Sequence, residues 1–261
     1  MRPFILIALL TFTALPALAA PTKMVPNNNI TILADDDMML PLAQLARAYS
    51  LETKTPLTIV MKSADDAQAQ IEQGLEAHIV ITANYPLLDR LADEGLTDVA
   101  SRKPIARTQL ALVTVGDLNK EANIARHISF ASMLYATNGM PVYMDDPSTI
   151  EGNRAAKLLS SHDFSGALAS RIESKPTHDE LIASLHDAPS LGLILAASAV
   201  TEPDVHVISL LADNVSPPVM FDSVVLGSEA MGDAKHFNDY LSTPKAHAIL
   251  AHFGYQAPLA K

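Results

Sequence analysis

Short apolar runs alternate with amphipathic segments through the first part of the chain. The predicted strands are Ile30–Ala34, Leu57–Met61 and residues 77–81. The predicted helices, which carry apolar residues at helical spacing, are residues 38–50, 64–73 and 86–94. Gly74 and Gly95 follow two of these helices at the position where helices commonly end. Alternating strands and helices predict an α/β domain built on a parallel sheet.

The second part of the chain predicts another group of elements, set between two apolar strands. Residues 109–115 (QLALVTV) and Val219–Leu226 are interpreted as two crossings between lobes. The elements predicted between and after these crossings are the helices 152–160 and 178–186, the strand Leu191–Leu195 and a helix pair over 234–252. This order predicts one lobe from residues 27–108 and 218–261, and a second lobe from residues 109–217, with a ligand held between them.

The first twenty residues read as a secretory signal peptide rather than part of the fold. Arg2 precedes an apolar run over residues 4–15, and small residues follow, which predicts cleavage after Ala19 or Ala20. The run is too short to span a bilayer. The chain contains no cysteine, so it has neither a disulfide nor a lipid-anchor site. We therefore expect a periplasmic protein without a direct membrane anchor.

Charge and composition narrow the class of function. The chain has 29 acidic and 18 basic residues, giving a formal net charge of −11 at pH 7. Such a surface repels nucleic acids and anionic membranes. The chain has no nucleophile elbow, no phosphate-binding glycine loop and no zinc-protease motif. Asp36 with Asp65 could serve as an acid–base pair, but the chain lacks the tryptophans of a sugar site. A binding protein without catalytic activity is predicted.

Four long segments of the chain carry a family resemblance. They are ITILADDDMMLPLAQLARAYSLETKTPLTIV, QIEQGLEAHIVITANYPLLDRLADEGL, SLGLILAASAV and PPVMFDSVVLGSEAMGDAKHFNDYLSTPKAHAILAHFGY. In spacing and pattern the chain resembles the periplasmic molybdate-binding proteins, the solute receptors of ABC importers. The resemblance implies a two-lobed α/β periplasmic binding protein fold of type II, with each lobe a sheet flanked by helices. It also implies a monomer without a cofactor that delivers an oxyanion to a permease in the inner membrane.

The resemblance also implies where the ligand binds. Its binding loops fall on Asp36, Asp37, Ser63, Ala64, Asp65, Glu151, Thr177 and Leu195. A family serine falls at Asp37 and a family tyrosine at Leu195, so two hydroxyl groups that meet the oxyanion are replaced. The loop of the second lobe is recognisable in Asp146-Pro147 and Gly152, and it contains Glu151. Thr177 opens a helix whose backbone could donate to the ligand.

Because of the acidic residues at these junctions, more than one class of ligand fits the sequence. A carboxylate 4 Å from a unit negative charge costs about 4 kcal/mol at an effective dielectric constant near 20, which is close to a thousandfold in affinity. The residues therefore also fit a divalent cation or an amine, and the candidate metal ligands are Asp35, Asp36, Asp37 and Asp65. Alternatively, Asp37 and Asp66 cap helices, Asp66 together with Ser63. A further alternative is a protein-interaction module that has lost its ligand.

Overall fold

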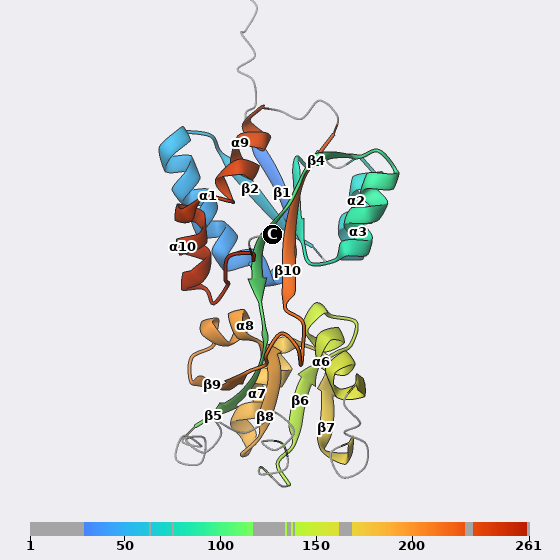
Figure 1. Cartoon of the computed structure of the whole chain (residues 1–261), viewed down its shortest axis with the longest axis vertical. Coiled ribbons are helices and arrows are strands. Elements are labelled where there is room, and N and C mark those ends of the chain that lie inside the picture. The colour runs from blue at the N-terminus through green and yellow to red at the C-terminus, as the bar shows by residue number, and fades with distance from the viewer. Residues whose placement is uncertain are drawn as a thin grey trace, which may run out of the picture.

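The chain folds into two lobes that are stacked along the long axis of the molecule (Figure 1). The computed structural model describes residues 29–62, 64–74, 76–116, 134, 137, 139–161, 169–227 and 232–259. The predicted signal peptide and Ser63 lie outside these residues. Each lobe contains a mixed sheet flanked by helices, which confirms the predicted two-lobed α/β architecture.

The first lobe is built on a sheet that draws strands from both ends of the chain. Its spatial order is β2 (Leu57–Met61), β1 (Ile30–Ala34), β3 (Ile79–Thr82), β10 (Val219–Leu226) and β4 (Thr97–Thr108). The first three strands are parallel, as their alternation with helices predicts, whereas β10 is antiparallel to both β3 and β4. β10 thus binds the C-terminal part of the chain into the N-terminal sheet.

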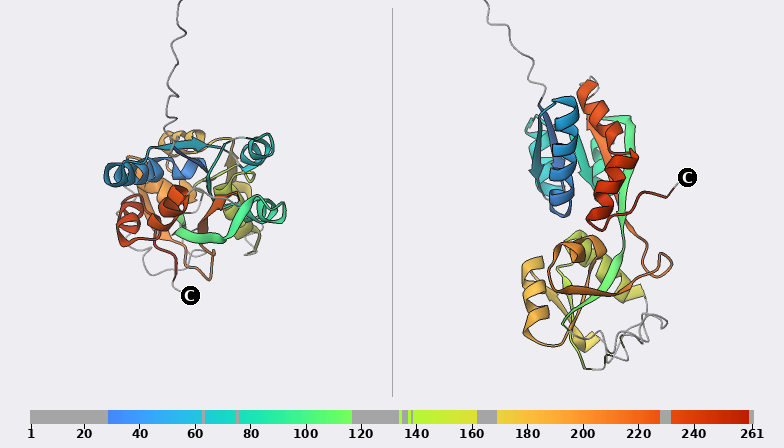
Figure 2. Two further views of the ribbon diagram at one scale, coloured as in Figure 1. Left: turned by 90° about the horizontal axis from the view of Figure 1, so that it is seen from above. Right: turned by 90° about the vertical axis from the view of Figure 1, so that its left-hand side faces the viewer.

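Helices cover both faces of this sheet (Figures 1 and 2). They are η1 (Asp36–Met38), α1 (Met39–Thr53), α2 (Ala64–Glu72), α3 (Tyr85–Asp93), α9 (Gly232–Tyr240) and α10 (Pro244–His252). The predicted helix pair near the C-terminus is confirmed, and Thr243 caps its second member by accepting a hydrogen bond from Ala246 N. Tyr49 of α1 packs edge-on against Phe237 of α9.

The second lobe has its own sheet, ordered β7 (Ile172–Lys175), β6 (Val142–Asp145), β8 (Leu191–Leu195), β5 (Leu110–Val115) and β9 (Val205–Leu210). β6 is parallel to β7 and β8, while β5 is antiparallel to β8 and β9. Its helices are α6 (Ile150–Ser161), η3 (Ala169–Arg171), α7 (His178–Asp187) and α8 (Ala196–Thr201). α8 follows β8 directly and α6 follows β6 after a four-residue turn (146–149), so both helices begin near the first lobe (Figure 1).

The chain passes between the two lobes at β4–β5 and again at the segment that joins β9 to β10 (Figure 2). Only Gln109 separates β4 from β5. The largest cluster of buried apolar side chains includes Ala106 before this point and Leu110 after it, together with core residues of both sheets. Hydrophobic packing therefore continues through this crossing.

Some strands of the structure were not predicted. β4 was missed because its sequence, TDVASRKPIART, is polar and contains Pro104, a residue that disfavours the interior of a sheet. It is tolerated at this edge position beside β10. β6 and β7 were also missed, since each has only four residues, and β9 was missed because its six residues mix polar and apolar positions. Among the described residues, no helix is both long and apolar enough to cross a membrane.

Candidate functional site

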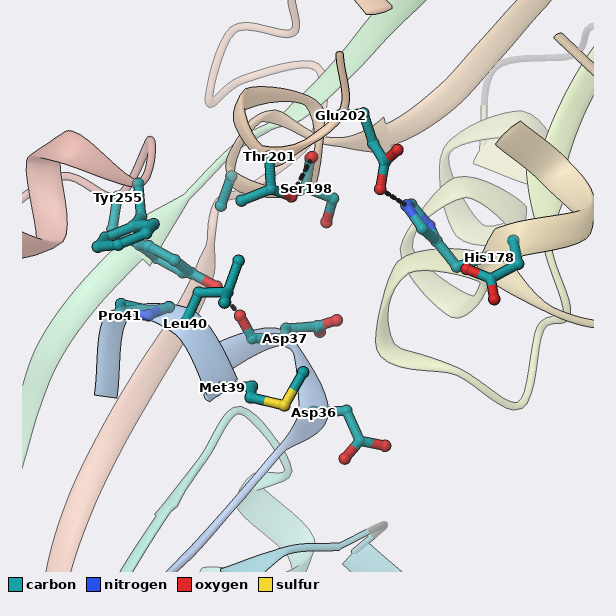
Figure 3. Close-up of a pocket in the computed structure, with 13 residues that line it drawn as sticks. Asp36, Asp37, Met39, Leu40, Pro41, His178, Ser198, Thr201, Glu202 and Tyr255 are labelled. Atoms are coloured by element: carbon teal, nitrogen blue, oxygen red, sulfur yellow. Dashed lines mark hydrogen bonds and ion pairs between the residues drawn. The ribbon is translucent and has the colours of Figure 1, made fainter. Parts of the chain in front are cut away.

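A cavity of about 380 Å³ lies between the two lobes (Figure 3). The first lobe contributes the start of α1 with the turn before it and the segment after α10, and the second lobe contributes the start of α7 and one side of α8 with the residue that follows it. The lining residues are Asp36, Asp37, Met39, Leu40, Pro41, Phe253 and Tyr255 from the first lobe, and His178, Asp179, Ala197, Ser198, Thr201 and Glu202 from the second. Because each lobe supplies polar groups, a ligand in this cavity would contact both lobes.

The three consecutive aspartates after β1 have different surroundings. Asp35 is buried, and its carboxylate accepts hydrogen bonds from Thr82 Oγ1 at 2.8 and 2.9 Å and from Ala83 N at 2.9 Å. Burial raises the pKa of Asp35 to about 6, against these hydrogen bonds, which lower it. Asp35 thus joins β1 to the end of β3 and does not line the cavity, contrary to its assignment with the candidate metal ligands.

Asp36 and Asp37 do line the cavity (Figure 3). They lie in the 3₁₀ turn η1, and the N-cap of α1 is Met38, so Asp37 is not the N-cap of that helix. The backbone carbonyl of Asp37 accepts a hydrogen bond of 2.8 Å from the hydroxyl of Tyr255, which fixes the turn. The Asp37 side chain is exposed to solvent, but it lies between the lobes, close enough to His178 and Asp145 of the second lobe to feel their charges. Desolvation in this position, together with the nearby Asp35, raises the pKa of Asp37 to about 6.

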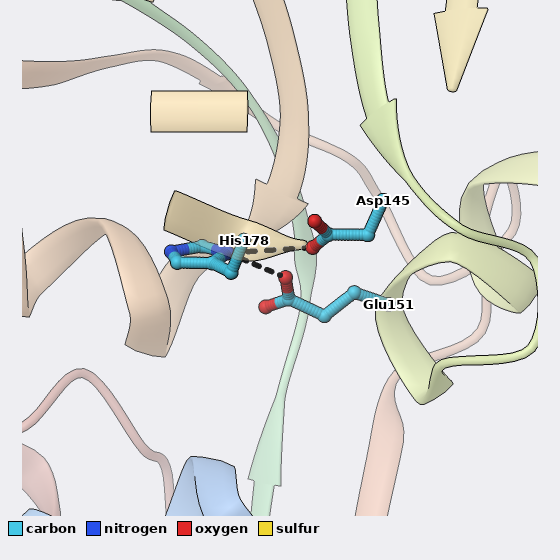
Figure 4. Close-up of side chains that lie close together, drawn as sticks. All are labelled: Asp145, Glu151 and His178. Atoms are coloured by element: carbon cyan, nitrogen blue, oxygen red, sulfur yellow. Dashed lines mark hydrogen bonds and ion pairs between the residues drawn. The ribbon is translucent and has the colours of Figure 1, made fainter. Parts of the chain in front are cut away.

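A group of three ionisable side chains lies in the second lobe, beside the cavity (Figure 4). Asp145 ends β6, Glu151 is in the first turn of α6, and His178 begins α7. The Nδ1 atom of His178 lies 3.3 Å from Asp145 Oδ2 and 3.4 Å from Glu151 Oε2. Both carboxylates are buried, whereas the imidazole is partly exposed and faces the cavity.

Glu151 is held by the start of α8 as well as by His178. Its Oε1 atom accepts a hydrogen bond of 3.0 Å from the backbone N–H of Leu195 and another from the hydroxyl of Ser198. Gly152 makes this placement possible, because a Cβ atom at that position would lie 2.1 Å from the backbone oxygen of Asp146. The glycine lets α6 begin close against the end of β6 and places Glu151 beside α8.

The charges within this trio largely compensate one another. Burial raises the pKa of Glu151 to about 8, so its carboxyl group is mostly protonated at neutral pH. Burial would lower the pKa of His178, but its hydrogen bonds with Asp145 and Glu151, together with the charge of Asp145, outweigh burial and raise the pKa to about 10. Burial opposes ionisation of Asp145, yet its hydrogen bonds with His178 and Glu151 hold its pKa below the usual value. The imidazolium therefore neutralises Asp145.

The spacing within the trio would also suit a metal ion, since one ligand atom from each residue lies within 4.8 Å of the others. Asp145 Oδ1 is buried and has no hydrogen-bond partner among the described residues, so it is open to a further ligand. A cation can bind here only if His178 gives up its proton, because the nitrogen that faces both carboxylates must then donate a lone pair. The raised pKa of His178 opposes this step.

The other sequence-predicted site residues are placed as follows. Thr177 caps α7, where its hydroxyl accepts a hydrogen bond of 3.2 Å from Glu180 N. The Leu195 side chain is fully buried, and its backbone N–H is taken by Glu151. Ala64 and Asp65 begin α2, with their side chains outside the described set, and the Asp66 side chain is exposed. The structure therefore brings Asp37 and Glu151 near one site but leaves Thr177 and Leu195 in structural roles.

The sequence did not single out Asp145, Ser198, Glu202 or Tyr255, and it placed His178 only on a helix without a zinc-type spacing. These residues are far apart along the chain and meet only because their strands and helices end at one interface. One available signal was the position of Asp145 at the end of an apolar strand. Carboxyl ends of parallel strands are where ligand-binding residues collect.

Comparison with known proteins places the sequence of this chain in a family. A family model described as bacterial extracellular solute-binding protein matches residues 30–256. The molybdate-binding protein ModA of Escherichia coli is 22% identical over 258 residues, which cover 93% of this chain and 94% of that protein.

Solved structures share the two-lobed fold of this chain. The substrate-binding domain of a putative molybdenum ABC transporter from Clostridium difficile superposes with a TM-score of 0.77 at 18% identity, covering 88% of this chain and 99% of that one. The tungstate-binding protein TupA from Desulfovibrio alaskensis superposes with a TM-score of 0.67 at 10% identity, covering 89% and 99%. At these identities the likeness shows the two-lobed fold.

Proposed function

Because the chain belongs to the bacterial extracellular solute-binding protein family, we propose that it captures a small oxyanion between its two lobes and delivers it to an ABC permease in the inner membrane. The observation that carries this proposal is that residues of both lobes line the space between them. The relatives add support for the ligand class, because they are described as binding molybdate or tungstate. The proposal includes export to the periplasm by the predicted signal peptide.

Capture would proceed by closure of the lobes about the two crossings. The β4–β5 connection and the segment before β10 are the two places where the chain passes between the lobes, so rotation about them would narrow the cavity. Closure about such connections commonly buries a ligand between domains. The permease would then recognise the closed form. Binding and release require no covalent chemistry, so we propose a receptor that acts without catalysis or a cofactor. We also propose that it is a monomer, as the family resemblance implies.

The carboxylates that line the cavity between the lobes restrict where an anion can bind. Asp36 and Asp37 line that cavity from the first lobe, and Glu202 lines it from the second. An anion 4 Å from one ionised carboxylate would lose about 4 kcal/mol at an effective dielectric constant near 20. An oxyanion held directly against Asp37 would therefore bind poorly at neutral pH. This agrees with the replacement of the family hydroxyl group that the sequence implies at the same position.

The test is thermal unfolding of the mature protein in the presence of molybdate, tungstate, sulfate, Mn²⁺ or Zn²⁺, each added separately. A ligand at about 100 times its dissociation constant adds about 2.7 kcal/mol, which shifts the midpoint by about 2–4 °C in a chain of this size. A shift with an oxyanion supports the proposal. A shift with a divalent cation alone overturns the anion and makes Asp145, Glu151 and His178 the candidate ligands of the cation. The matched variant H178Q then abolishes the cation response.

A further inference from the structure

A second cavity lies between the lobes, on the other side of the crossing strands from the first. Its volume is about 420 Å³. The first lobe lines it with the start of α3, the second lobe lines it with the start of α6, and the segment leading into β10 lines it as well. In Figure 1, α3 and α6 lie on the opposite side of β10 from α8 and α10, which flank the first cavity. The cavity therefore also spans both lobes beside a crossing.

Two cations of α6 reach this cavity without a counter-ion. Arg154 and Lys157 are three residues apart, so they project from the same face of the helix. Within the part of the chain that the structure describes, neither side chain takes part in a hydrogen bond or an ion pair. Arg154 is partly buried and Lys157 is exposed at the mouth of the cavity, and desolvation lowers the pKa of the Arg154 guanidinium, as expected of a partly buried cation without a carboxylate partner.

The wall opposite these cations is also suited to an anion. Asn84 is the N-cap of α3, and its side-chain oxygen accepts a hydrogen bond of 3.0 Å from Leu87 N, which leaves the amide nitrogen available for a ligand. The positive end of the α3 dipole adds to the charge of Arg154 and Lys157. No acidic residue is among the described residues that line this cavity.

The two interlobe cavities therefore have opposite charge. The first is lined by Asp36, Asp37, Asp179 and Glu202, against a single imidazolium, His178. The second is lined by Arg154 and Lys157. An anion that enters between the lobes lowers its electrostatic energy by moving toward the second cavity, because opposite charges at 4 Å attract by about 4 kcal/mol at an effective dielectric constant near 20.

We infer that the oxyanion or carboxylate group of the captured solute binds in the second cavity, between Arg154 and Lys157 of one lobe and the N-terminal end of α3 in the other. This rests on the proposed function and assigns its anion to residues away from Asp37. The guanidinium can hold two oxygens of the group at once, while the ammonium adds a point charge. Ile150 and Val219 line the same cavity, which leaves an apolar surface for a small organic part of the solute.

The test is isothermal titration calorimetry of the mature protein with two kinds of anion. Molybdate, tungstate and sulfate represent inorganic oxyanions, and phospholactate represents a small organic acid. The variants are R154Q and K157Q. The matched control is R47Q, which removes the same charge from an exposed position on α1. Unfolding midpoints without ligand are measured for every variant, so that loss of binding is separated from loss of folding.

Hydrogen bonds to a charged partner contribute about 1.5–3 kcal/mol, so R154Q should weaken the anion that binds by about 10- to 100-fold. K157Q should weaken it less, and R47Q should leave it unchanged. If the wild type binds an anion and R154Q binds it equally well, the second cavity is excluded while the proposed function stands. If the wild type binds none of these anions, the proposed function and the second-cavity site both fail. Preference for phospholactate over the inorganic ions would identify an organic solute.

Discussion

The Glu151 carboxyl group accepts a hydrogen bond of 3.0 Å from the backbone N–H of Leu195, at the start of α8. Both residues occupy positions that the family resemblance assigns to the ligand. In this chain they bind each other. The Glu151 side chain takes the Leu195 N–H, which could otherwise donate a hydrogen bond to an anion. Because the Leu195 N–H is already taken by Glu151, an anion between the lobes must find its partners elsewhere.

Replacing Glu151 should distinguish the shape of its side chain from its charge. E151A leaves the Leu195 N–H and the Ser198 hydroxyl without their acceptor, and we expect it to lower the free energy of unfolding by about 3 kcal/mol. E151Q keeps an acceptor oxygen in place, and Glu151 is mostly protonated at pH 7 because its pKa is raised to about 8. E151Q should therefore cost less than about 1 kcal/mol. Urea unfolding at pH 7 measures both. Equal losses in the two variants would contradict the neutral state of Glu151.

Asp35 should make the protein less stable as pH rises from about 4 to 7. The pKa of Asp35 is raised from 3.8 to about 6 in the folded state, so the folded protein holds this proton more tightly than the unfolded chain does. Its contribution is complete below pH 3.8 and is lost as pH rises through 6, a change of about 3 kcal/mol. Urea unfolding at several pH values measures it. D35N keeps the acceptor for Thr82 and Ala83 but cannot titrate, so its stability should decline less over this range, the remaining decline coming from groups such as Asp37, whose pKa is also raised. An identical profile in D35N would refute the assignment.

Gly152 should tolerate no side chain. A Cβ atom there would lie 2.1 Å from the backbone oxygen of Asp146 and 2.3 Å from that of Asp145, and backbone atoms cannot move aside cheaply. We expect G152A to lower the free energy of unfolding by about 2 kcal/mol or more. The matched control is G232A at the start of α9, where a Cβ atom meets nothing within 4 Å. Thermal unfolding compares the two, and a stable G152A would show that the β6–α6 turn can relax.

Asp37 should oppose anion binding in a pH-dependent way. Its carboxylate faces the interlobe space, so D37N should raise the affinity for a bound anion by about tenfold at pH 7, through removal of a charge at medium range. The pKa of Asp37 is raised to about 6, so the wild type should approach D37N near pH 5, where the aspartate is protonated. Calorimetric titrations at pH 5 and pH 7 measure this. E94Q, which removes an exposed charge beyond α3, serves as the control. Unchanged affinity in D37N would place the anion beyond the influence of Asp37.

Local pattern was enough to locate most elements of the first lobe. β1, β2 and α1 have periodic apolar residues. Gly74 and Gly95, with positive φ angles of 85° and 71°, follow the ends of α2 and α3. β4 escaped detection because its stability comes from pairing with β10, more than a hundred residues away, and not from its own apolar pattern. Where a neighbouring strand supplies the hydrogen bonds, the sequence of a strand carries little signal.

The sequence by itself determined the two-lobed α/β architecture and the acidic loop Asp35, Asp36 and Asp37, because strand and helix periodicity and family spacing are local properties. Only the tertiary structure decided what these acids do. It turned Asp35 inward to Thr82 and Ala83, left Asp37 facing the interlobe space, and paired Glu151 with His178 and Leu195. It also brought Arg154 and Lys157 opposite α3. Side-chain direction and charge compensation depend on which distant elements meet, and that is set by packing of the whole chain.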